Sequence, residues 1–230
     1  MLLRACKNQL ILQRGDFLVM ALVALGAVAL GEGVTTLVMV MADPEDYFML
    51  APFLLFLVAG LTTLFLSAAY WMTVFPMGVR MGATRREMVA GTLCLTVVMN
   101  LMLFGFVALS NLLERTLGVG YWVDTVGKEL EIDPLYLVPG WAWPLLVVGC
   151  TLGGLLAGTV VLRFGRKGFW VLWGAWMVLA LLPQFLPDDF NLPIFPPEFW
   201  MVLPWLTAAA VAALSLAAVW LLLRLPLREE

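Results

Sequence analysis

Residues 74–88 read VFPMGVRMGATRREM, a short basic stretch that separates two long apolar runs. The flanking runs cover about residues 50–75 and 88–113. Each is long enough to cross the hydrocarbon core of a bilayer, which takes a helix of about 20 apolar residues. This region therefore predicts two transmembrane helices joined by a polar connection.

The composition extends this prediction to the whole chain. Of its 230 residues, 63% are hydrophobic and only 13% are charged, whereas soluble domains are about 45–50% apolar and about 25% charged. A water-soluble fold of this length cannot bury so much apolar surface. The net charge of −3 lacks the basic balance of a nucleic-acid-binding protein, so we expect membrane lipid and no nucleic acid among the partners.

We expect an all-α polytopic membrane fold, with one transmembrane domain over residues 1–230 and six transmembrane helices. The spans are predicted at about residues 17–41, 50–75, 88–113, 141–162, 168–186 and 200–223. The fifth is short and ends at Pro183 and Pro187, so a kinked or re-entrant element is its alternative. Residues 1–16 alternate polar and apolar side chains at helical spacing, which predicts an amphipathic helix on the inner membrane surface.

The charges between the spans predict the orientation. Eleven of the 13 basic residues fall at the two termini and in the connections between spans two and three and between spans four and five. Eleven of the 16 acidic residues fall on the opposite side. Because basic residues concentrate on the cytoplasmic side of a membrane protein, we expect both termini and the 76–87 loop in the cytoplasm. Residues 114–140 are then an extracellular loop, in which a short helix is expected.

Enzyme motifs are missing from the sequence. There is no His, no GxxxxGK[ST] phosphate-binding loop, no HExxH and no GxSxG. Three widely separated cysteines, Cys6, Cys94 and Cys150, make a disulfide or zinc site a poor interpretation. We also expect no pair of carboxylates inside the spans. The sequence thus predicts a non-catalytic chain with no metal or cofactor of its own.

Glu32 is the carboxylate that falls well inside a predicted span, between Gly31 and Gly33. An ionised side chain at the bilayer centre costs about 2.5–3.5 kcal/mol on insertion scales. One hypothesis is that Glu32 lines a transport pathway or meets a cationic group of a cargo. The other is that the span begins later and that Glu32 lies near the outer headgroups.

The 76–87 loop has signals for a short helical turn. Pro76 is expected to interrupt the second span, because it removes a backbone donor and clashes with the preceding turn. Thr84 and Glu87 have the spacing of a capping box at the start of a helix. The alternative interpretation is an ordinary basic loop that contacts anionic lipid.

Residues Phe75–Gly91, with Phe75-Pro76 followed by Gly82-Ala83-Thr84-Arg85-Arg86 and Gly91, resemble the stretch between spans two and three of ABC-2-type permeases. These are the membrane subunits of bacterial ABC exporters. The six predicted spans and the amphipathic N-terminal helix are similar to that family as well. The chain is most similar to its short members, which include exporters of amphipathic peptide toxins such as phenol-soluble modulins, lantibiotic-immunity transporters and drug exporters.

The resemblance implies a function. Two copies of the permease would pair with two copies of a separate ATP-binding cassette subunit, which would hold ATP and Mg. The 76–87 loop would be the coupling helix that docks on that subunit. By the match, the docking residues are Gly82, Ala83, Thr84, Arg85, Arg86 and Glu87. The cargo would be an amphipathic peptide or a hydrophobic small molecule, exported across the bacterial plasma membrane.

Two other functions stay open from the residues alone. One is a self-sufficient membrane protein, either a secondary transporter or an intramembrane enzyme acting on lipid. A proton-driven carrier usually needs several buried ionisable groups, and we expect only Glu32. The other is a structural or regulatory membrane subunit that docks a partner without transporting.

Overall fold

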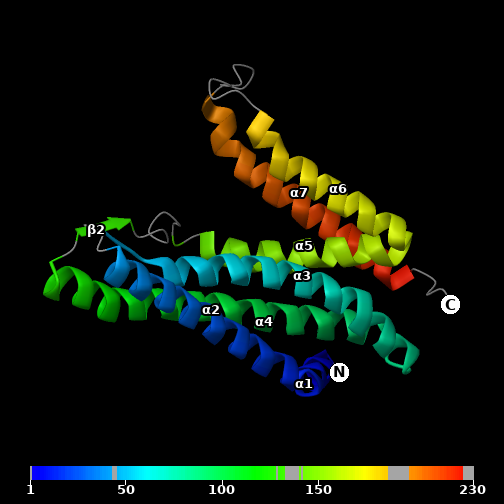
Figure 1. The fold of residues 1–230 in the computed structure, drawn as a ribbon. Coiled ribbons are helices and arrows are strands. Elements are labelled where there is room, and N and C mark those ends of the chain that lie inside the picture. Colours follow the sequence, from blue (N-terminus) through cyan, green and yellow to red (C-terminus); the bar gives the residue numbers. More distant parts are fainter. Residues whose placement is uncertain are drawn as a thin grey trace. The chain divides into compact units, whose positions relative to one another are not determined.

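The structure is a computed structural model and describes residues 2–42, 46–127, 129–132, 140, 142–185 and 197–224. Helices dominate it (Figure 1). They are α1 (Leu2–Leu12), α2 (Arg14–Met41), α3 (Leu50–Arg80), α4 (Arg85–Leu113), the π-helix η1 (Glu114–Thr125), α5 (Ala142–Phe164), α6 (Arg166–Phe185) and α7 (Pro197–Arg224). Two short strands, β1 (Asp46–Phe48) and β2 (Glu129–Ile132), pair in parallel. The expected helical class is confirmed, and this strand pair is the departure from it.

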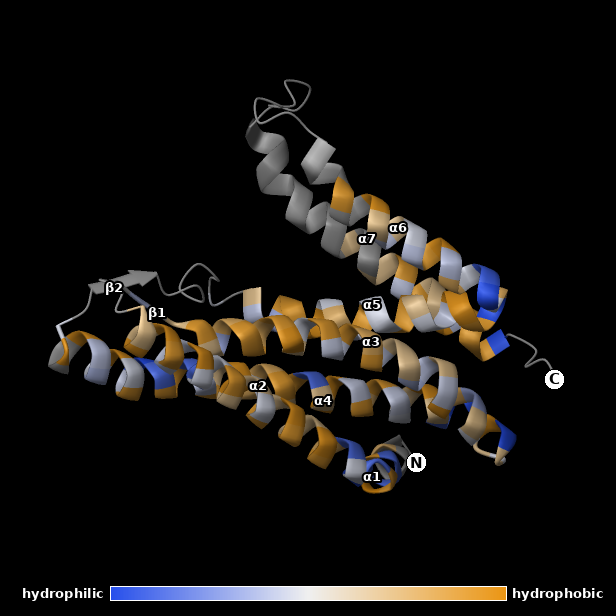
Figure 2. Cartoon of the chain, viewed as in Figure 1, coloured by the Kyte–Doolittle hydropathy of each residue, from blue (hydrophilic) through white to orange (hydrophobic). Residues whose placement is uncertain are grey.

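Four helices of the described part are long and apolar enough to cross a membrane: Arg14–Met41, Leu50–Arg80, Arg85–Val123 and Ala142–Phe164. Residues Ala212–Arg224 within α7 add a shorter apolar helix. Figure 2 shows the long helices as mostly hydrophobic, with hydrophilic colour gathered near several helix ends. The first four predicted spans are therefore confirmed as long apolar helices, while six spans with cytoplasmic termini stay a prediction.

The N-terminal segment forms a helix separate from the first long one. α1 ends at Leu12, and Gln13, with φ −96° and ψ 18°, leaves the helical conformation before α2 begins. The predicted helix in residues 1–16 is thus confirmed, and its place on the membrane surface stays a prediction. Cys6 of α1 donates a hydrogen bond from Sγ to the carbonyl of Ala90 in α4 (3.7 Å).

The prediction that Pro76 interrupts the second span is wrong. α3 contains Pro76 and continues to Arg80, so the connection to α4 is limited to residues 81–84. The helix ends where Gly82 adopts a φ of +92°, a left-handed conformation that favours glycine. A proline removes one backbone hydrogen bond, whereas a left-handed residue turns the chain out of the helix, and here the second effect sets the boundary.

The predicted 114–140 loop also begins too early. The helix does not stop after Leu113, because η1 continues it to Thr125, and residues Arg85–Val123 form one long apolar helix. Glu114 looked like the end of the span because it is charged, yet it is only 2% exposed. The Tyr47 hydroxyl donates a hydrogen bond to this carboxylate, so the helix can continue past Glu114.

The chain divides into two units, residues 1–66 with 90–151 and residues 67–89 with 152–230. In the first, the buried amide of Asn100 donates from Nδ2 to Thr151 Oγ1 (2.9 Å), which joins α4 to α5. In the second, Gly154 and Gly158 of the GxxxG pair approach Ser67 and Trp71 of α3 so closely that a Cβ at either glycine would overlap them. These glycines serve helix packing within one chain.

Candidate functional site

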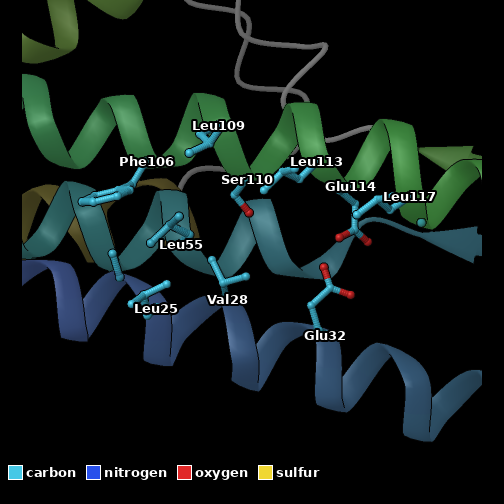
Figure 3. A pocket seen from close by; sticks show the side chains of 12 residues that line it. Leu25, Val28, Glu32, Leu55, Phe106, Leu109, Ser110, Leu113, Glu114 and Leu117 are labelled. Carbon is cyan, nitrogen blue, oxygen red and sulfur yellow. The ribbon is translucent and has the colours of Figure 1, made fainter.

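The first unit contains a cavity of about 380 Å³ lined by α2, α3, α4 and η1 (Figure 3). Most of its lining is hydrocarbon, from Leu25, Val28, Leu55, Phe106, Leu109, Leu113 and Leu117. Its polar side chains are Glu32, Ser110 and Glu114. We refer to it as the Glu114 cavity.

Two carboxyl groups face each other across this cavity. Glu32 projects from α2 and Glu114 from the first turn of η1 (Figure 3). Glu114 is buried and Glu32 is exposed. The expectation that the spans contain no carboxylate pair is therefore wrong, because Glu114 lies inside the continued helix.

Tyr47 of β1 is the partner that holds Glu114 in place. Its side chain is fully buried, and its hydroxyl donates a hydrogen bond to Glu114 Oε1. Burial, together with this hydrogen bond and the negative charge beside it, raises the pKa of Tyr47 above its ordinary value. The phenol thus stays protonated at neutral pH and remains a donor. Trp122 of η1 stacks on the Tyr47 ring with centroids 6.5 Å apart.

The second oxygen of Glu114 is not satisfied. Oε2 is buried and has no hydrogen-bond partner within the part of the chain that the structure describes. A buried polar atom without a partner is costly, and most so when it carries charge. Glu114 is therefore half compensated: Tyr47 donates to one of its oxygens, and the carboxyl group lines the cavity opposite Glu32 (Figure 3).

Two glycines make room for this arrangement. A Cβ at Gly118 would overlap the Tyr47 hydroxyl and lie 3.2 Å from the Glu114 carboxyl group. A Cβ at Gly31 would overlap the backbone of Ala51 in α3. Gly31 thus allows α2 to approach α3 closely, which places the neighbouring Glu32 at the cavity, and Gly118 allows Tyr47 to reach Glu114.

The chemistry available at the site is that of a carboxyl pair in an apolar setting. Two carboxylates that face each other in an apolar setting repel each other, and a bound positive charge relieves the repulsion. Across the described residues, no group of three or more His, Cys, Asp or Glu side chains is placed to hold a metal ion. The arrangement is therefore suited to a ligand that carries a positive charge.

Of this site, the sequence identified Glu32 but missed Glu114 and Tyr47. A usable signal was present for Glu114: Phe106, Ser110 and Glu114 recur every four residues, a spacing that puts them on one helical face. The charge of Glu114, taken alone, instead favours a span that ends at Leu113. Tyr47 carries no such signal, because it is 67 residues away from Glu114 along the chain.

The connection between α3 and α4 belongs to the second unit and has a defined geometry. At the end of α3, the amide of Gly82 donates to the Val79 carbonyl (3.1 Å) and that of Ala83 to the Gly78 carbonyl (3.0 Å). This pairing is a Schellman motif, with Gly82 in the left-handed position. The α3 end is therefore closed by backbone hydrogen bonds.

A capping box follows at once and confirms the prediction for Thr84 and Glu87. The Glu87 amide donates to Thr84 Oγ1 (3.3 Å), and the Thr84 amide donates to Glu87 Oε2 (3.3 Å). The Thr84 hydroxyl also donates to Glu87 Oε2 (2.8 Å). Both ends of the four-residue connection are thus fixed by hydrogen bonds.

The two arginines after Thr84 differ in their surroundings. Arg85 is half-buried, and its Nη1 donates to the carbonyl of Leu223 near the end of α7 (3.5 Å). Arg86 is exposed, as is Gly82, while Ala83 is half-buried. The predicted docking residues therefore lie together in one turn, and Arg86 presents its charge to the surroundings more openly than Arg85.

No family model, curated protein or solved structure matches the chain. The resemblance to ABC-2-type permeases accordingly rests on residues 75–91 and on the pattern of apolar segments.

Proposed function

We propose that this chain is the permease subunit of an ATP-driven exporter in a bacterial plasma membrane. The observation that carries the proposal is the turn at residues 81–87, which is short, closed by hydrogen bonds at both ends and rich in basic charge. A force applied to a rigid turn moves the helices that it joins, whereas a flexible loop would absorb it. Such a turn is suited to receive motion from a partner protein.

The partner would be a separate ATP-binding cassette subunit, because the sequence has no phosphate-binding loop. ATP and Mg would bind that subunit, and a second copy of the permease would complete the pathway. Arg86 would contact a carboxylate of the partner, while Arg85 would hold the turn to α7 through Leu223. The cargo would be an amphipathic peptide or a hydrophobic small molecule, in keeping with the apolar helices.

The docking role is tested by charge reversal. We expect Arg86→Glu to abolish co-purification of the proposed ATP-binding cassette subunit, or to remove the stimulation of its ATPase activity by the permease. Lys167→Glu is the matched control, because Lys167 is an exposed basic residue at the start of α6 outside the turn. Full retention of the complex and of its coupling in Arg86→Glu would refute the docking assignment.

A second candidate function is a carrier driven by a proton or cation gradient. The observation that favours it is that Glu32 and Glu114 face each other across the cavity, since ionisable groups inside membrane segments commonly mark ion pathways. The two functions separate in proteoliposomes that contain the purified chain alone. Cargo movement driven by an imposed ion gradient, without ATP or a partner, would favour the carrier.

A further inference from the structure

The Glu114 cavity has a chemical requirement that the described protein atoms do not meet. Glu114 is 2% exposed, and its Oε2 is buried without a hydrogen-bond partner among the described residues. Tyr47 donates only to the other oxygen. A ligand that brings both a positive charge and an N–H donor to Oε2 would meet this requirement, because hydrogen bonds between charged groups are the strong ones.

The rest of the cavity limits what such a ligand can be. Leucine and phenylalanine side chains make up most of the wall, so the ligand must also present hydrocarbon. The volume of about 380 Å³ is at the small end of the usual range for ligand pockets, about 300–1,000 Å³. The described residues include no cluster of three or more His, Cys, Asp or Glu side chains that could hold a metal ion.

We propose that the Glu114 cavity binds a protonated amine with a compact apolar body, its N–H groups directed at Glu114 Oε2 and its charge shared with Glu32. The hydrocarbon body would lie against Leu55, Phe106 and Leu109. As the substrate class of an exporter this inference rests on the proposed function, whereas binding itself requires neither ATP nor a partner. The amine can be a free small molecule or the headgroup of an aminophospholipid.

A matched pair of probes isolates the charge. Aminoadamantane carries a protonated amine on a compact hydrocarbon cage, and adamantanol places a neutral hydroxyl on the same cage. The full chain is reconstituted in nanodiscs of phosphatidylcholine, which has no N–H donor in its headgroup, and each probe is titrated by calorimetry. We expect the amine to bind at least about tenfold more tightly than the alcohol, because only the amine makes a charge-assisted hydrogen bond to Glu114.

Variants locate the site. Glu114→Gln should weaken amine binding by about tenfold or more and leave alcohol binding unchanged, since the charge is lost while the cavity remains. Glu32→Gln, at the exposed side, should cause a smaller loss. Asp16→Asn is the control, because it removes one negative charge from α2 without touching the cavity. The retained alcohol affinity reports that the cavity is folded.

Two results would overturn the proposal: equal affinity of the intact chain for amine and alcohol, or undiminished amine binding in Glu114→Gln. If Glu114→Gln also loses affinity for the alcohol, its cavity is not folded. The proposal is then judged by the ratio of amine to alcohol affinity in the intact chain and by the loss of amine affinity in Glu32→Gln. Phosphatidylethanolamine in the nanodisc distinguishes the two sources of amine. Competition with the probe identifies the lipid headgroup as an occupant, and unchanged probe binding identifies the small molecule. Failure here leaves the Arg86 test untouched.

Discussion

At the scale of single residues, the hydrogen bond from Tyr47 to Glu114 decides whether the long helix can carry a charge in its interior. Tyr47→Phe removes the donor and leaves both Glu114 oxygens without a partner among the described residues. We expect a loss of about 1–3 kcal/mol in the free energy of unfolding, the usual cost of an unsatisfied buried group. The midpoint of thermal unfolding in nanodiscs measures it. Tyr121→Phe is the control, because Tyr121 is 57% exposed, and equal midpoints for the two variants would contradict the role of Tyr47.

The same residues show how far the sequence predicts a site. Glu32 stands out because a carboxylate in an apolar run is costly wherever the helix packs. Glu114 lies where an apolar run meets a polar one, and its role depends on a tyrosine that another segment brings to it. A local pattern identifies residues that are unusual in their own helix, and it cannot identify those whose partners are distant in the chain.

At the scale of elements, helix ends that depend on nearby residues are predictable from the sequence, and those that depend on distant packing are not. The capping box of Thr84 and Glu87 is correctly predicted, because its hydrogen bonds join residues three apart. The effect of Pro76 is wrongly predicted, because a proline lowers the stability of a helix without fixing where it ends, and here the Schellman motif at Gly82 fixes it. Turn chemistry that closes within a few residues is predictable, and helix continuation that depends on packing is not.

The packing of α2 on α3 gives a prediction at this scale. Gly31→Ala introduces a methyl group that meets the backbone of Ala51, while Gly33→Ala, two residues along the same helix, meets open space. We expect Gly31→Ala to cost about 1–3 kcal/mol, as overpacking does, and to reduce amine binding by moving Glu32. Gly33→Ala should be neutral or slightly stabilising, because alanine favours a helix over glycine. Thermal unfolding and calorimetry measure both effects, and equal behaviour of the two variants would exclude a close α2–α3 contact.

At the scale of the whole molecule, the orientation follows from charges that no single element contains. The basic residues gather at alternate ends of successive apolar segments, and this alternation predicts an even number of spans with both termini inside. Four of these segments are long apolar helices in the described residues, and α6 and α7 place further helices at the last two predicted spans. Whether α6 and α7 cross the membrane depends on the thickness of the bilayer as well as on their own hydrophobicity.

The contact between α1 and α4 gives a test of whether the first unit folds as described. Cys6 of α1 donates to the carbonyl of Ala90, one helical turn before Cys94 in α4, so two cysteines with 87 residues between them in the sequence are brought close together. With Cys150 replaced by Ser, mild oxidation with copper phenanthroline should join Cys6 to Cys94 and protect both thiols from a maleimide polymer that shifts the gel mobility. In the control, Cys94→Ser with Cys150 retained, the second thiol belongs to α5 instead of α4, so both thiols should stay reactive. Full reactivity in the Cys6–Cys94 pair after oxidation would mean that α1 does not pack on α4, and the amphipathic helix would then have to be held by lipid alone.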